Sequence, residues 1–355
     1  MIDFRGVALA LSVLALPMLT LPVLAGGSAR ADSQLSVYTW TGYELPKFHA
    51  QYDKAHPEGA AITVFGGDDE AFAKIKSGFH PDISHPCIDK LPQWREAGLI
   101  QPIDTSRIHN WEHLFPLLRG LPGIVADGKV WMMPWDWANT SITYRTDLVQ
   151  GHPDSWSLLW DPRYDQRLAV IDETKDAWLI AAIMAGVDPF KESLADIDKV
   201  SAMLRKQLPL IRLYTTDMTS VEQSLASGEV VAAMTWNATY VNLKKQGIPV
   251  AFMQPREKML TWACGLVILK GASNLDKVYD FLNAMSSDET GVALMRTYGY
   301  GTANKAAFDS VPSADRAAMA LPQDPEHALR DTLFVMPMQN RDAIAAAFQT
   351  VKAGG

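Results

Sequence analysis

The sequence has little of what several protein classes require. Its 355 residues include only two cysteines, Cys87 and Cys264, and their spacing fits neither a zinc ribbon nor a redox Cys-x-x-Cys motif. Acidic residues outnumber basic ones by 40 to 32, which gives a net charge of −8. A nucleic-acid-binding protein needs a basic face, so no nucleic-acid partner is expected. After residue 25 no stretch is long and apolar enough to suggest a membrane span.

The one long apolar run, over residues 7–25, lies near the N-terminus. It follows Arg5 and precedes Ala29-Arg30-Ala31, small residues of the kind that signal peptidase recognises. The pattern predicts a signal peptide over residues 1–31 and export to the periplasm, although the length of the run also suits a membrane anchor. Export permits a disulfide between Cys87 and Cys264 if their Cα atoms lie within about 7 Å, with two buried thiols as the alternative.

Strand patterns and helix patterns alternate along the rest of the chain. Residues 35–40, 61–65 and 82–84 read as strands, and helices are expected from Pro46, after residues 66–69 and around residues 88–97. This alternation predicts an α/β fold with mainly parallel sheets. The residues that remain after position 31 exceed one ordinary core, so two lobes are expected.

Ligands of such sheets bind beyond the carboxyl ends of the strands. The residues expected to end strands are Trp40-Thr41, Ser84-His85, Glu173, Trp236 and Trp262. Three of them are tryptophans, and an indole face attracts an ammonium group. Seven of the other tryptophans fall into two predicted groups, clustered loops (Trp131, Trp135, Trp137) and core (Trp94, Trp156, Trp160, Trp178).

Several short segments occur together in one order. After the first predicted strand comes Trp40-Thr41-Gly42-Tyr43. The later segments are residues 81–84, 98–104, 155–160, 228–230, 234–237, 260–262, 298–304 and 339–340. In this order the chain resembles the spermidine/putrescine-binding proteins of ATP-driven importers over essentially its whole length after residue 31.

The resemblance implies a two-lobed, type II periplasmic-binding-protein fold with the ligand in the interlobe cleft. Crossing strands would join the lobes. Lobe one would comprise residues 35–139 and 263–308, and lobe two residues 140–262 and 309–355. Ligand binding would close the lobes about a hinge, and an inner-membrane ABC permease would read the closed form. No cofactor is implied, and a monomer is the default expectation.

The resemblance also implies a ligand site. Aromatic walls would come from Trp40, Tyr43, Trp236, Trp262 and Tyr300. Glu173 and Asp176, three residues apart at a helix start, would hold an ammonium. Polar contacts are expected from Thr41, Ser84, His85 and Gln339.

The chain departs from this family pattern at two positions. Cys264 and Gly42 stand where relatives often carry acids, and a linear diamine needs an anion at both ends. Asp136, predicted in a hinge-side loop, is the candidate replacement. The alternative is a γ-aminobutyrate-like ligand with one amine, whose carboxylate would need an arginine. Arg212 is the first candidate, followed by Arg145 and Arg256.

Other interpretations stay open at this point. Cys264 and His85 are candidates for a nucleophile and its base, but they lie in no recognisable catalytic motif. His85, Cys87 and Cys264 are candidate ligands for a soft metal. A sensory rather than a transport role would use the same fold and site.

Overall fold

A mixed twelve-stranded sheet organises residues 34–354, the part of the chain that the computed structural model describes. The main path of neighbouring strands is β2-β1-β3-β12-β7-β10-β8-β9. Strands β4 and β14 pair with β12, whereas β11 and β13 pair with β7. The strands are β1 (Ser36–Trp40), β2 (Ala61–Phe65), β3 (Ile83–Ser84), β4 (Ile100–Gln101), β5 (Val125–Ala126), β6 (Lys129–Val130), β7 (Met133–Arg145), β8 (Leu168–Ile171), β9 (Ile211–Thr215), β10 (Ala232–Trp236), β11 (Val250–Phe252), β12 (Leu260–Leu269), β13 (Gly301–Thr302) and β14 (Leu333–Phe334).

Helices connect most of these strands. The α-helices are α1 (Pro46–Ala55), α2 (Asp68–Lys76), α3 (Leu91–Glu96), α4 (Pro116–Arg119), α5 (Leu179–Met184), α6 (Asp196–Gln207), α7 (Met218–Ser227), α8 (Asn237–Lys245), α9 (Leu275–Met285), α10 (Asp288–Tyr298), α11 (Lys305–Ser310), α12 (Ser313–Ala318), α13 (Pro325–Arg330) and α14 (Arg341–Lys352). Short 3-10 turns are η1 (Thr105–Arg107), η2 (Trp111–His113), η3 (Trp156–Trp160), η4 (Pro162–Tyr164) and η6 (Leu208–Leu210), and η5 (Thr174–Trp178) is a π-helical turn. The strands and helices expected between residues 35 and 97 are all present, with ends shifted by at most a few residues.

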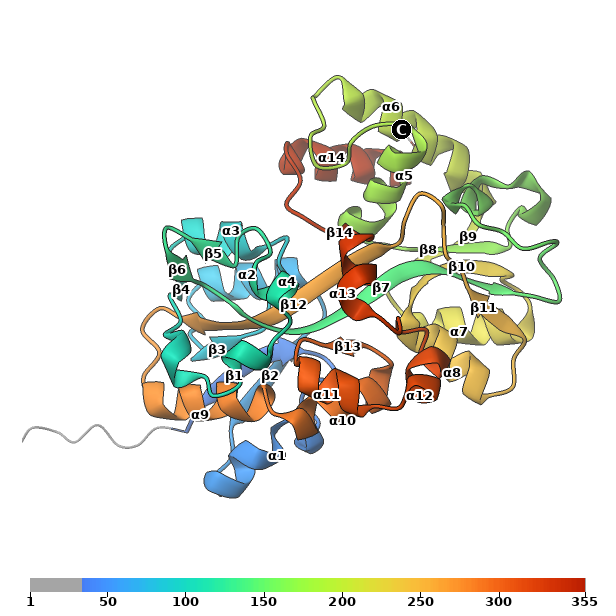
Figure 1. The fold of residues 1–355 in the computed structure, drawn as a ribbon. Helices are drawn as coiled ribbons and strands as arrows, with labels where there is room; N and C mark the ends of the chain where they lie inside the picture. The colour runs from blue at the N-terminus through green and yellow to red at the C-terminus, as the bar shows by residue number, and fades with distance from the viewer. Residues whose placement is uncertain (1–33, 355) are drawn as a thin grey trace, which may run out of the picture. The chain divides into compact units, whose positions relative to one another are not determined.

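The sheet is parallel in its outer parts and antiparallel in its middle. Strand β1 pairs in parallel with β2 and β3, and β8 pairs in parallel with β9 and β10. The long strands β7 and β12 run antiparallel to each other and continue through both halves of the sheet (Figure 1). The alternation of strands and helices predicted the parallel parts. The crossing strands were expected from the family resemblance alone, and the predicted boundaries at 139/140 and 262/263 fall within β7 and β12.

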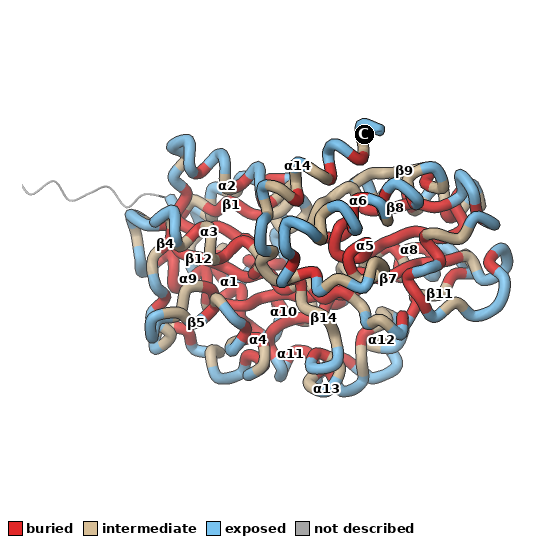
Figure 2. Tube along the Cα trace, turned by 90° about the horizontal axis from the view of Figure 1, so that it is seen from above, coloured by how far each residue is buried: buried red, intermediate tan, exposed pale blue. Residues whose placement is uncertain are grey.

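Two hydrophobic clusters form the main cores, one on each side of the crossing strands. The first contains Trp94, Trp135 and Trp137, and the second contains Trp156 and Trp178, all of them buried. Figure 2 shows the buried segments inside and the exposed ones on the outer helices and loops. Trp135 and Trp137 therefore lie in β7 as core residues, and the prediction of clustered loops was wrong for them because their neighbours in β7 are also buried.

The first cluster also takes in Val311, Leu321 and Leu329, from a stretch that the sequence assigned to lobe two. The predicted lobe boundaries themselves stay a prediction. The predicted signal peptide, residues 1–31, lies outside the described residues. Within residues 34–354, no helix has the length and apolar character needed to cross a membrane.

Asp82 fastens β1 and β3 to the turn before α9. Its Oδ2 accepts hydrogen bonds from the backbone N–H and the hydroxyl of Ser36, at 2.9 and 2.8 Å. Its Oδ1 accepts the same two kinds of bond from Ser273, at 2.8 and 3.1 Å. Asp82 is only 6% exposed, whereas Ser36 is half-buried and Ser273 is exposed.

We expect Asp82→Ala to lower the free energy of unfolding by about 1–3 kcal/mol, because the half-buried backbone N–H of Ser36 loses its carboxylate acceptor. Denaturant unfolding measures the change. Asp315→Ala, at a half-exposed side chain of α12, is the matched control and should change stability by about 0.5 kcal/mol or less. Equal effects of the two substitutions would contradict this role of Asp82.

Candidate ligand-binding site

A cavity of about 400 Å³ lies where the two halves of the sheet meet. Its lining is mostly aromatic and acidic. The lining residues are Trp40, Thr41, Tyr43, Phe65, Gly66, Cys87, Asp136, Glu173, Lys175, Thr216, Asp217, Trp236, Trp262, Cys264, Tyr298 and Tyr300. Trp40, Phe65 and Trp236 end strands β1, β2 and β10, so strand ends supply part of this wall as expected.

Nine of the thirteen predicted site residues line this cavity. They are Trp40, Thr41, Tyr43, Asp136, Glu173, Trp236, Trp262, Cys264 and Tyr300. The rings of Trp262 and Tyr300 meet edge to face with centroids 5.0 Å apart, and Tyr298 lies 5.4 Å from Tyr300. The rings thus form a continuous wall.

Two of the expected residues reach this wall from a different local structure. Trp262 is the third residue of β12 and does not end a strand. Asp136 belongs to β7 and not to a loop. Both expectations were wrong because each residue lies within a crossing strand, and the crossing brings these strand residues to the cavity without a strand end or a loop.

Asp136 lies directly opposite Cys264 in the β7–β12 register. Its Oδ2 accepts a hydrogen bond of 2.6 Å from the Tyr43 hydroxyl, and its Oδ1 lies 3.1 Å from Nε2 of His85. The carboxylate is 1% exposed but borders the cavity. Asp136 therefore supplies an acid on the strand next to Cys264, the position where an acid was expected from the family resemblance.

Four predicted residues are not among the lining residues. Ser84 is buried and donates to the carbonyl oxygen of Tyr38. His85 is buried between the Thr39 hydroxyl and Asp136, so it supports a lining residue without bordering the cavity. Gln339 is exposed in the loop before α14.

Asp176 is the fourth residue outside the lining. It is 1% exposed, and its Oδ1 accepts a hydrogen bond of 3.2 Å from the Thr140 hydroxyl. The expectation that Glu173 and Asp176 face the cleft together relied on α-helical spacing. That spacing fails because η5 is a π-helical turn.

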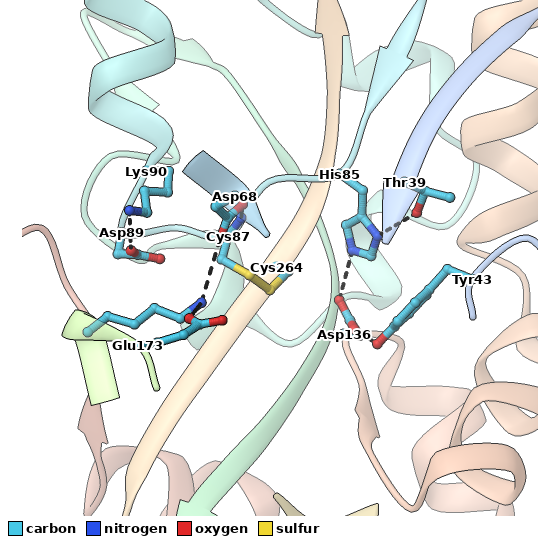
Figure 3. The surroundings of a disulfide bond; sticks show 11 residues. Thr39, Tyr43, Asp68, His85, Cys87, Asp89, Lys90, Asp136, Glu173 and Cys264 are labelled. Carbon is cyan, nitrogen blue, oxygen red and sulfur yellow. Dashed lines mark hydrogen bonds and ion pairs between the residues drawn. A yellow bond between two sulfur atoms is a disulfide. The ribbon is translucent and has the colours of Figure 1, made fainter. Parts of the chain in front are cut away.

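Cys87 and Cys264 are joined by a disulfide bond, and both border the cavity (Figure 3). The bond links the loop after β3 to the crossing strand β12. With both sulfurs bonded to each other, Cys264 has no thiolate to act as a nucleophile. The soft-metal alternative also loses two of its three ligands, and residues 34–354 contain no cluster of His, Cys, Asp and Glu fit for a metal.

The three arginines considered for a carboxylate lie away from the cavity. Arg212 is half-exposed and pairs with Glu229. Arg145 pairs with Asp147 and also donates to backbone carbonyls, and Arg256 pairs with Asp154. The hypothesis about Arg212 was wrong because an apolar strand-like context does not fix which face of β9 a side chain occupies.

Lys175 lines the cavity but is not among the predicted site residues. Its Nζ lies 3.2 Å from Oε2 of Glu173, 3.6 Å from Oδ2 of Asp68 and 5.6 Å from the centroid of the Trp40 ring. Burial opposes its charge, but the carboxylates of Glu173, Asp68, Asp89 and Asp176 outweigh that effect and raise its pKa well above the usual value. Lys175 is therefore charged at every physiological pH.

The acids around Lys175 respond to burial in the opposite sense. Desolvation raises the pKa of Asp68 to about 6, although Lys175 acts against it. Desolvation, together with the charge of Glu173, raises the pKa of Asp176 to about 7. Several carboxyl groups, those of Glu173, Asp68 and Asp176 among them, thus surround the single ammonium of Lys175.

Most of the other lining residues that were not predicted also stand at strand ends. Phe65 and Gly66 stand at the carboxyl end of β2, and Thr216 and Asp217 follow β9. Strand ends in doubly wound sheets face the ligand site, so the same reasoning applied to every strand finds them. Tyr298 adjoins Tyr300 in the segment 298–304.

Gly42 has a structural reason to lack a side chain. Its φ is +96°, and a Cβ there would lie 2.7 Å from the Tyr298 hydroxyl oxygen. That hydroxyl donates a hydrogen bond of 2.6 Å to the carbonyl oxygen of Gly42. A side chain at position 42 would displace the tyrosine from the wall.

The family model described as "Bacterial extracellular solute-binding protein" matches residues 47–321. The chain belongs to this family. Among its curated relatives is the "Spermidine/putrescine-binding periplasmic protein" of Salmonella typhimurium. It is 25% identical over 288 residues, which are 80% of this chain and 81% of the relative.

Solved structures of solute-binding proteins share the fold. The spermidine/putrescine substrate-binding protein PotD from Streptococcus pneumoniae superposes with a TM-score of 0.75 at 22% identity, covering 90% of this chain and 99% of its own. A structure titled "Atu4243-GABA receptor" superposes with a TM-score of 0.71 at 18% identity, covering 91% and 98%. The likeness establishes the two-lobed α/β fold, and the names show that one fold serves ligands of different charge.

We expect Asp176→Asn to stabilise this solute-binding protein increasingly as the pH rises. Between about pH 4 and 7 the folded protein keeps a proton on Asp176 that the unfolded chain releases, so stability falls as pH rises through this range. The substitution removes that loss and should gain about 2–4 kcal/mol relative to wild type between pH 4 and pH 8.

Denaturant unfolding at the two pH values measures this gain. Asp198→Asn, at an exposed carboxylate of α6, is the control. Its free energy of unfolding should differ from that of wild type by the same amount at both pH values. A pH-independent effect of Asp176→Asn would show that Asp176 does not titrate in this range.

Proposed function

We propose that this protein captures a small aliphatic amine in the periplasm and delivers it to an inner-membrane ABC permease, without catalysing a reaction. The observation that carries the proposal is the composition of the cavity. Aromatic rings form its wall, and carboxylates lie on either side of the Cys87–Cys264 disulfide, Glu173 on one side and Asp136 on the other (Figure 3).

This composition matches the chemistry of an alkyl ammonium. Ring faces desolvate a methylene chain and attract the cation, which contributes about 0.5–2 kcal/mol for each ring. A charge-assisted hydrogen bond to a buried carboxylate adds more. Micromolar affinity needs about −8 kcal/mol in total, and one such contact with several rings can supply this after the ordering costs.

The names of the relatives support amines as the ligand class. The Salmonella relative and the pneumococcal structure are both named for spermidine and putrescine. Polyamines are therefore the first ligands to test. Asp136 is the residue we propose to hold the primary ammonium, since it faces Cys264 across the strands and borders the aromatic wall.

Calorimetry on ligand-stripped protein with putrescine, spermidine, γ-aminobutyrate, choline and zinc tests the function. Micromolar or tighter binding of at least one primary amine is expected. Binding of zinc alone, or of no compound in the set, would refute the proposed capture of amines.

We expect Asp136→Asn to lower the affinity for every amine that binds by at least about 30-fold. The reason is that a buried ammonium would lose its counter-charge, which is worth about 2–5 kcal/mol. Calorimetry with the tightest amine measures the loss. Asp342→Asn, at an exposed residue in the first turn of α14, is the matched control and should bind like wild type. Undiminished binding by Asp136→Asn would remove Asp136 from the site.

A further inference from the structure

The lining contains one ammonium group of the protein itself. Lys175 comes from η5, and its side chain is 15% exposed. Its Nζ has a carboxylate oxygen at 3.2 Å and another at 3.6 Å, and the Trp40 ring lies 5.6 Å away. Two acids and a ring face are the surroundings that the ammonium of a ligand would need.

We propose that Lys175 permanently fills the second cation position of the cavity, so that the ligand carries one ammonium and a neutral or anionic far end. This inference rests on the proposed function and narrows its ligand class. A diamine held at Asp136 would bring its second ammonium toward a site where a cation is already paired. An ω-amino acid would bring a carboxylate there instead.

The acidic groups near Lys175 hold its ammonium in place. Of the acids whose charges act on it, Asp68 also accepts a hydrogen bond from the backbone N–H of Cys87, and Asp89 lies 4.0 Å from Lys90. Moving the Lys175 ammonium away would remove the cation that lies 3.2 Å from Glu173 and 3.6 Å from the buried Asp68, and an unpaired buried carboxylate is costly. Lys175 is therefore a fixed part of the wall in this arrangement.

Three ligands of similar length separate the possibilities. Putrescine carries two ammoniums, 1-aminobutane carries one, and γ-aminobutyrate carries one together with a carboxylate. For wild type we expect γ-aminobutyrate to bind at least about tenfold more tightly than putrescine by calorimetry. We expect 1-aminobutane to bind no more weakly than putrescine.

Replacing the lysine should reverse this order. In Lys175→Met, the affinity for putrescine should rise and the affinity for γ-aminobutyrate should fall, each by at least about tenfold. The reason is that Glu173 and Asp68 then lack the ammonium of Lys175 as their counter-charge. Lys175→Arg keeps the charge and should keep the wild-type order. Lys206→Met, at an exposed residue of α6, is the matched control and should leave all three affinities unchanged.

The outcomes separate the two proposals. Amine binding with a wild-type preference for putrescine, or an order that Lys175→Met leaves unchanged, would overturn the role of Lys175 while the capture of amines stands. If Lys175→Met does not fold, the wild-type order and Lys175→Arg decide. Failure of every amine to bind wild type would overturn the proposed function and this inference together.

Discussion

The structure depends on the antiparallel pairing of β7 with β12. These two strands pass through both halves of the sheet, and their backbone hydrogen bonds hold Asp136 opposite Cys264 and Trp262 opposite Ala138. The register shifts between Cys264 and Gly265. At Gly265 any Cβ would meet the carbonyl oxygen of Met133, so the close approach of the strands requires glycine there. The backbone pairing of β7 with β12 thus sets the positions of the cavity residues that these two strands carry.

The sequence predicted those parts of the site that depend on local patterns. Trp40 ends a short strand rich in β-branched and aromatic residues, and Trp236 ends a short, mostly apolar strand. Strands of these kinds can be predicted from local composition. Ser84 also ends a strand, yet its hydroxyl bonds to the carbonyl of Tyr38. Ending a strand brings a residue to the right edge of the sheet but does not decide whether its side chain points outward or into the core.

Long-range pairing was the information that the sequence did not carry. Asp136 was expected in a loop, and Arg212 was expected near the ligand. The first lies in a buried strand because β7 has neighbours from remote parts of the chain, and the second turns toward Glu229 on the surface. Lys175 was hidden for a related reason, since one of its carboxylates, Asp68, stands more than a hundred positions earlier in the chain. A fold shared with relatives leaves such chain-specific charges undetermined.

Two ion pairs connect the halves at the rim of the site. Lys175 of η5 pairs with Asp68 of α2, and Arg341 of α14 pairs with Asp69 of the same helix. In each pair the cation belongs to the second half and the acid to the first. Any motion that separates the halves must therefore pull apart unlike charges, even when the cavity is empty. These two pairs therefore favour the described arrangement of the halves over a wider separation, and their contribution weakens as salt screens the more exposed pair, Arg341 with Asp69.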